Sequence, residues 1–142
     1  MNAVYCGPPP LPDHIWTSWN LDPALLVALA ALTFVVRHRW AGLAAVAVMF
    51  VAFVSPLCAL SSALFSARVV HHVLLVAVAA PLLALALQPR LPAAIAPAFA
   101  TSAVVLWAWH HPMAYDLALS NIAVYWLMQL SLLGVTAPLL PQ

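Results

Sequence analysis

Long apolar runs, broken by only four short polar or proline-containing segments, constrain this chain more than any other feature. The interruptions are RHRW at 37–40, SPLCALSSALFSA at 55–67, QPRLP at 88–92 and HHPMAYDLALSN at 110–121. A helix that crosses a bilayer needs roughly 17 to 25 residues. The runs therefore predict five spanning helices, at about 21–37, 41–57, 68–88, 92–109 and 120–140. No alternating strand pattern is visible, so helices are the expected spanning elements.

Charged residues are almost absent from the chain. Of the 142 residues, 67% are hydrophobic, with four Lys or Arg and three Asp or Glu. Soluble domains carry about 25% charged residues, so the surface of this chain is expected to face lipid. The prediction is an all-α, polytopic transmembrane helix bundle that forms one integral membrane domain over residues 1–142. The net charge of +1 gives no reason to expect a nucleic-acid partner.

The first twenty residues, 1–20, are expected to form an arm outside the helix bundle. They lack the basic region followed by an apolar region that marks a cleaved signal peptide. Their prolines predict a short, stiff segment. Cys6 lies in this arm and Cys58 in the second interruption, which leaves a disulfide open and gives no support for a CxxC metal site.

The positions of the arginines predict the orientation of the bundle. Three of the four lie in the first and third interruptions, at Arg37, Arg39 and Arg90. These two connections must lie on the same side of a membrane, and an excess of Lys and Arg is typical of the cytoplasmic side. The N-terminus is therefore expected outside. Arg68 is the exception, because it falls at the outer end of the third helix.

In this orientation, the polar side chains that could bind a ligand are expected in one layer at the outer face. An Arg at the centre of a spanning helix costs about 2.5 to 3.5 kcal/mol on insertion scales, and less near an interface. The outer layer holds Asp13, His14, Asp22, Arg68, His71, His72, His110, His111, Met113 and Asp116. Of the six histidines, only His38 is expected on the inner side.

Two adjacent histidines open the third apolar run. Arg68 and His72 are four residues apart and share a helix face, whereas His71 is rotated from His72 by about 100°. Only one of the two imidazoles is therefore expected on the face of Arg68. Arg68 itself is expected to anchor the helix end at lipid phosphates or to pair with Asp22 or Asp116.

A second pair of histidines, His110 and His111, precedes Pro112, which disfavours a helical conformation just before it. An imidazole held there by a loop could face the third helix. Neutral imidazoles bind Cu, Zn or Fe, and sulfur ligands favour Cu(I). The predicted metal ligands are His72 and His110 first, then His71, His111 and Met113, with Cys58 and Cys6 as further sulfur candidates. Asp116 could orient a ligating histidine. The alternative is that the histidines form loop hydrogen bonds and that Met113, Cys58 and Cys6 serve packing, which is the commoner role of such sulfur side chains.

Several motifs together resemble a known family. They are WNLDP at 19–23, SPLCALSSALFSARVVHHVLL at 55–75, APLLALALQP at 80–89 and WAWHHPMAYDLAL at 107–119. In this order, over about residues 16–135, they resemble the CtaG family of cytochrome c oxidase (caa3-type) assembly factors. The resemblance implies a multi-pass protein of the bacterial inner membrane that matures a haem-copper oxidase. It also implies cytochrome c oxidase subunits as partners and a part in copper supply.

The resemblance implies a functional role most directly for His72 and His110. It implies framework roles for Tyr115, Asp116, Pro56 and Pro112. The chain departs from the family at Ala67 and Arg68, where members carry a further histidine, and at Gln129, near which they carry another. Two histidines cannot close a usual tetrahedral site. Either another side chain supplies the missing ligand, or metal binding is lost.

Three functions thus remain open from the sequence. The first is an assembly factor that handles Cu(I) at the outer face. The second is a non-catalytic accessory subunit or scaffold, bound to a respiratory oxidase with no metal of its own. The third and weaker one is a b-type haem protein, since histidines on two helices can supply both axial ligands. Enzymatic activity is not expected, because neither a nucleophile with its base nor a glycine-rich phosphate loop is recognisable.

Overall fold

The computed structural model describes residues 5–87 and 95–136, and these residues form helices and no strand. The all-α prediction is therefore confirmed. In chain order the elements are the 3-10 helix η1 (Pro12–Thr17), α1 (Pro23–Val36), α2 (Trp40–Phe53), α3 (Pro56–Ala63), α4 (Phe65–Val73), the π-helical segment η2 (Leu74–Ala79), α5 (Ala80–Leu87), α6 (Ile95–His110), α7 (Pro112–Ser120) and α8 (Ile122–Thr136).

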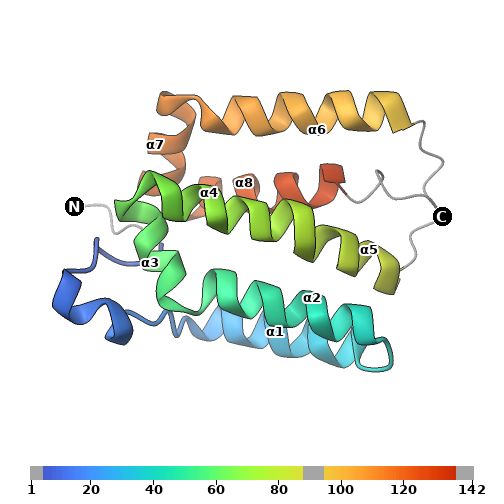
Figure 1. Cartoon of the computed structure of the whole chain (residues 1–142), viewed down its shortest axis with the longest axis horizontal. Helices are drawn as coiled ribbons and strands as arrows, with labels where there is room; N and C mark the ends of the chain where they lie inside the picture. Colours follow the sequence, from blue (N-terminus) through green and yellow to red (C-terminus); the bar gives the residue numbers. More distant parts are fainter. Residues whose placement is uncertain (1–4, 88–94, 137–142) are drawn as a thin grey trace.

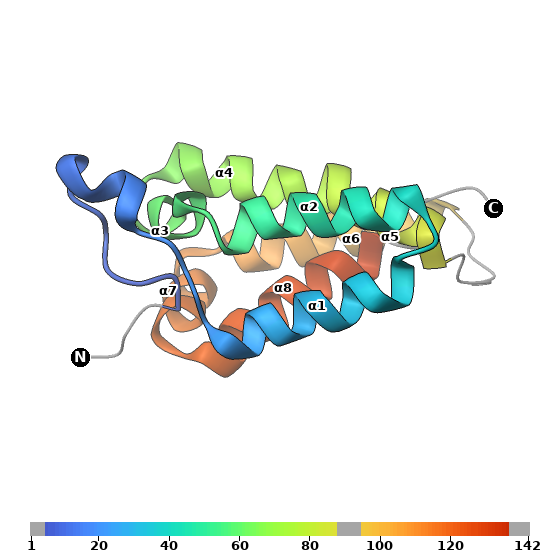
Figure 2. The ribbon, with the colours of Figure 1, turned by 90° about the horizontal axis from the view of Figure 1, so that it is seen from below.

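The longer helices lie side by side along the long axis of the molecule (Figure 1). The short helices α3 and α7 lie together at one end, and the turn between α1 and α2 lies at the opposite end (Figures 1 and 2). The N-terminal arm is on the side of α3 and α7. The fold thus has two chemically different ends, one with the arm and the short helices, the other with Arg37 and Arg39.

The five predicted helical segments correspond to α1, α2, the continuous helix α4–η2–α5, α6 and α8. Among the described residues, one helix, Phe65–Leu87 with 23 residues, is long and apolar enough to cross a membrane. The pair α2 and α3, bent by 50° at its break, would make a second if it formed one span. The remaining apolar helices α1 and α8 are shorter than a typical span.

Two segments predicted as polar interruptions contain helices instead. Ser55 begins α3 by accepting a hydrogen bond from the backbone N–H of Leu57, and Pro56 takes the first helical position. Pro112 takes the same position in α7. Proline is favoured there because its missing N–H has no partner inside the helix. The prolines that signal an interruption are therefore also the residues that start a short helix.

The continuous helix widens directly after its two histidines. The π-helical segment Leu74–Ala79 is followed by Pro81, which cannot donate a hydrogen bond to the carbonyl of Ala77. Widening the turn to a longer hydrogen-bond spacing accommodates this proline without breaking the helix.

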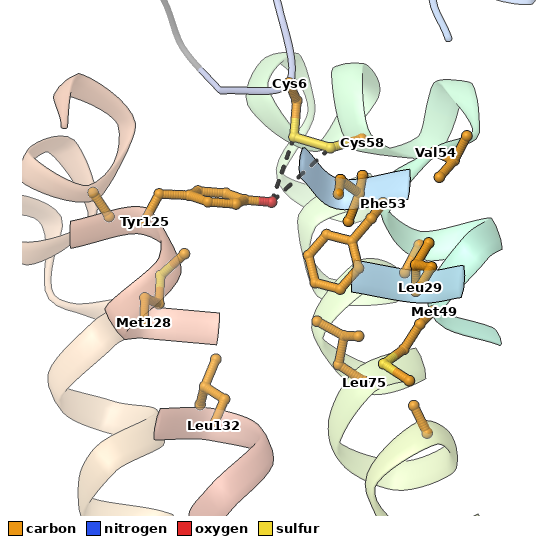
Figure 3. Close-up of a cluster of buried hydrophobic side chains, with 14 of the residues drawn as sticks. Cys6, Leu29, Met49, Phe53, Val54, Cys58, Leu75, Tyr125, Met128 and Leu132 are labelled. Carbon is orange, nitrogen blue, oxygen red and sulfur yellow. Dashed lines mark hydrogen bonds between the residues drawn. A yellow bond between two sulfur atoms is a disulfide. The ribbon is translucent and has the colours of Figure 1, made fainter. Parts of the chain in front are cut away.

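The core consists of buried aliphatic, methionine and aromatic side chains between the helices, among them Leu29, Phe53 and Met128 (Figure 3). Leu75, Met128 and Leu132 are the largest apolar side chains that are fully buried. Alanine on facing helices lets their backbones approach closely. One close approach is at Gly42 of α2, which lies against Val36 of α1 and Ala86 of α5.

The N-terminal arm is fixed to the bundle by a disulfide between Cys6 and Cys58. Tyr5 stacks on Tyr125 with ring centroids 4.8 Å apart, and its hydroxyl donates to Asp22 over 2.5 Å. Burial and this hydrogen bond raise the pKa of Tyr5. The alternative left open by the sequence is thus decided in favour of a disulfide, and neither sulfur is a metal ligand in this oxidised state.

Candidate metal-binding site

His72 of α4 and His110 of α6 face one another at the end of the bundle that carries α3 and α7. Their ring centroids are 5.3 Å apart with an interplanar angle of 77°. The His72 side chain is only 5% exposed, whereas His110 is exposed at the last position of α6. Two helices distant in sequence therefore bring one buried and one accessible imidazole together.

The backbone determines which nitrogen of His110 is free. Its Nδ1 lies 2.7 Å from the carbonyl oxygen of Leu106. A carbonyl can only accept, so Nδ1 carries the proton and the lone pair of neutral His110 lies on Nε2. Ligating histidines commonly donate their other N–H to such a carbonyl, which fixes the ring. The neighbouring Trp109 donates to the hydroxyl of Ser131 over 2.9 Å and holds this end of α6 against α8.

His71 lies one step deeper than His72. Its ring centroid is 5.7 Å from that of His72, and its side chain is 1% exposed. Its Nε2 lies 3.4 Å from the amide nitrogen of Gln129, and Phe53 packs edge-on against the ring. The carbonyl of Ala52 lies beside the ring, because Pro56 has no N–H to offer it. Three imidazoles thus form a row from the exposed His110 to the buried His71.

This row contains buried polar atoms with no hydrogen-bond partner within the described part of the chain. They are Nδ1 of His72 and Oε1 of Gln129, together with Nδ1 of His71, whose ring has the carbonyl of Ala52 nearby but outside ideal hydrogen-bond geometry. An unsatisfied buried polar group costs about 1 to 3 kcal/mol. Such groups persist where a water or a ligand completes them, so the unpartnered nitrogen of His72 fits the binding of a metal ion.

Arg68 does not form the ion pairs expected for it. Its guanidinium lies over the ring of Tyr115, 3.5 Å from the centroid, and its Nε donates to the carbonyl of Ser61 over 3.4 Å. Asp22 is instead occupied by Tyr5, and Asp116 is exposed. Burial raises the pKa of Tyr115, although the charge of Arg68 opposes the change. Arg68 and Tyr115 therefore join α4, α7 and α3 beside the histidines.

Two other predicted ligands are exposed at the surface. His111 is exposed at the start of α7, and the side chain of Met113 is 77% exposed. His38 accepts a hydrogen bond from Arg37 at the opposite end of the molecule. Across residues 5–87 and 95–136, no group of three or more His, Cys, Asp or Glu side chains could hold a metal ion.

The contact between Gln129 and His71 was not predicted from the sequence. The available signal was the one amide side chain in the largely apolar run 122–135, which is costly in lipid unless it has a partner. A shallow pocket of about 270 Å³, lined by Leu106, Trp107 and His110, opens beside the site. Since His72 and His110 already contact edge to face, a haem between them would require α4 and α6 to separate.

Comparison of the chain with protein-family models, curated proteins and solved structures gives no match. The resemblance to the CtaG family therefore stays a prediction that depends on the motifs in the sequence.

Proposed function

We propose that this protein is a multi-pass membrane assembly factor for a haem-copper cytochrome c oxidase, and that His72 and His110 hold Cu(I) as cargo at its outer face. The observation that supports copper binding is the pairing of the two imidazoles, with ring centroids 5.3 Å apart, on separate helices. The oxidase as partner comes from the resemblance of the sequence motifs to the CtaG family. His110 offers a lone pair with its other nitrogen fixed, and His72 offers an unpartnered buried nitrogen.

A site with two protein ligands suits delivery. Copper binds well to imidazole, and open coordination positions allow ligands of an acceptor to attach before the first ligands leave. The exposed His110 is the ligand that an acceptor can reach. The buried His72 would retain the ion until transfer is complete.

The orientation of the bundle is supported by its two ends. Disulfides persist in oxidising compartments such as the bacterial periplasm. The disulfide joins the arm to α3, at the end of the molecule where α4 and α6 approach α3 and α7, whereas the turn between α1 and α2, which carries Arg37 and Arg39, lies at the opposite end (Figure 1). Both features favour the histidine end as the outer one. The five helical segments, with short helices covering the outer end, would then form the membrane bundle.

Copper binding provides the test. Purified protein in detergent, titrated with Cu(I) against a chromophoric chelator, is expected to bind one ion. Loss of an outer-shell partner already weakens metal sites by about 10- to 100-fold, so His72→Ala and His110→Ala should each weaken binding by at least about a hundredfold. His38→Ala, at the opposite end, serves as the control and should bind as wild type.

Oxidase assembly in cells that depend on this protein separates it from a scaffold. Both alanine variants are expected to lose assembled oxidase while still reaching the membrane. Normal oxidase levels with either variant would reject the copper role and leave the accessory subunit as the function. A Soret band in the purified protein would instead identify the haem alternative.

Reagent accessibility tests the orientation independently. With the native disulfide intact, a membrane-impermeant maleimide added to spheroplasts is expected to label a Ser120→Cys variant at the end of α7. A His38→Cys variant, in the turn between α1 and α2, should react only after the membrane is opened. The opposite pattern would place the histidine pair inside the cell and contradict the proposal.

A further inference from the structure

The disulfide between Cys6 and Cys58 is surrounded by hydrogen-bond donors. The hydroxyl of Tyr125 lies 3.5 Å from Sγ of Cys6 and 3.9 Å from Sγ of Cys58 (Figure 3). The amide nitrogen of Asn20 lies 3.9 Å from Sγ of Cys58. Disulfide sulfur carries no proton, so Tyr125 and Asn20 are the donors in these contacts.

Donors of this kind do little for a disulfide, whose sulfur is a weak acceptor. They do much more for a thiolate, because hydrogen bonds to an ionised acceptor are roughly twice as strong as neutral ones. Tyr125 is buried, so its hydroxyl is shielded from competing water beside the sulfurs. The surroundings of this bond therefore suit the reduced, ionised pair as well as the oxidised one.

We infer that Cys6 and Cys58, when reduced, form a second Cu(I) site at the same end of the molecule as the histidine pair. Their Cα atoms are 5.2 Å apart, which places both sulfurs within reach of one ion. Thiolates are the softest ligands that a protein offers and select Cu(I). This site does not depend on His72 or His110, so it stands or falls separately from the proposed function.

Occupancy of the site is set by redox state. A dithiol reductant of the outer compartment gives two electrons and two protons to the disulfide, which becomes two thiols while the reductant becomes a disulfide. One Cu(I) then replaces the two thiol protons, which pass to solvent. When the disulfide form of the same reductant takes the two electrons back, it returns to a dithiol, the S–S bond of Cys6 and Cys58 is restored, and the ion loses both thiolate ligands and is released. Copper would therefore bind here only while the arm is in its reduced state.

Four copper titrations, again against a chromophoric chelator under anaerobic conditions, test the inference. Oxidised wild type should bind one Cu(I), and wild type reduced and freed of reductant should bind two. The double variant His72→Ala/His110→Ala should bind none when oxidised and one when reduced. Absence of binding in the oxidised wild type would reject the histidine site alone, because the gain of one ion on reduction would remain.

Two further variants locate the second ion. In the double-histidine background, Cys58→Ser should abolish binding by the reduced protein, and Tyr125→Phe should weaken it several-fold because a donor to sulfur is lost. Equal copper binding before and after reduction would overturn the inference. Loss of helical circular dichroism on reduction would overturn it as well, since the site requires a folded reduced protein.

Discussion

Replacing Cys58 by serine is expected to lower the free energy of unfolding by about 4 kcal/mol. The Cys6–Cys58 bond joins residues 52 positions apart, so it removes a large loop-closure entropy from the unfolded chain. It also holds Tyr5 against Tyr125, and that stacking contact would be weakened with the bond. Thermal unfolding of the purified protein in detergent, followed by circular dichroism, measures the loss.

Two comparisons make this prediction specific. Cys6→Ser should cost as much as Cys58→Ser, because either variant removes the same bond. Ser62→Ala, in the same helix as Cys58, removes only a hydrogen bond to the carbonyl of Ala59 and should change stability by much less. If Cys58→Ser unfolded at the same temperature as wild type, the anchoring role of the bond would be wrong.

Gly42→Ala is expected to destabilise the protein by about 1 to 3 kcal/mol. A Cβ at this position would collide with the side chain of Val36 and lie 3.1 Å from Cβ of Ala86. Neither neighbour is the free end of a flexible chain, so α1, α2 and α5 would have to move apart. The same unfolding measurement should therefore show a lower melting temperature.

The matched control for this substitution lies in α8. A Cβ at Gly134 would meet nothing within 4 Å, and the residue is exposed. Gly134→Ala should therefore stabilise the helix by up to about 1 kcal/mol through helix propensity alone. Opposite signs for the two substitutions would show that close approach at Gly42 holds α1 and α2 together. Equal effects would contradict this packing.

Sequence reasoning located the helical segments because hydrophobic runs and their interruptions are local features. It did not identify α3 and α7 as helices, since each is only eight or nine residues long and contains polar side chains. A local signal also suggested that His110 could face His72, because Pro112 ends α6 next to His110. Because both histidines were expected at the same depth in the membrane, the sequence could suggest that they pair across helices. It could not give the distance between their rings.

The deeper part of the row could not be predicted for a physical reason. Helices that are apolar on every side carry no amphipathic signal that tells which face meets which neighbour. The rotation between His71 and His72 suggested that only one of them would lie on the face of Arg68, but it gave no indication that both would be buried. Neighbouring helices flank α4 on two sides, with Phe53 and Gln129 against His71 and His110 against His72.

The wide turn of η2 also determines in which direction the two histidines point relative to α5. One residue added to or removed from an α-helix rotates everything beyond it by about 100°. The segment between His72 and Pro81 contains the π-helical turn, so its residue count fixes how the face bearing the imidazoles is aligned with the face of α5 that packs on α2. Deleting a single residue there would leave every side chain of the site in the sequence and turn the imidazoles away from their partners.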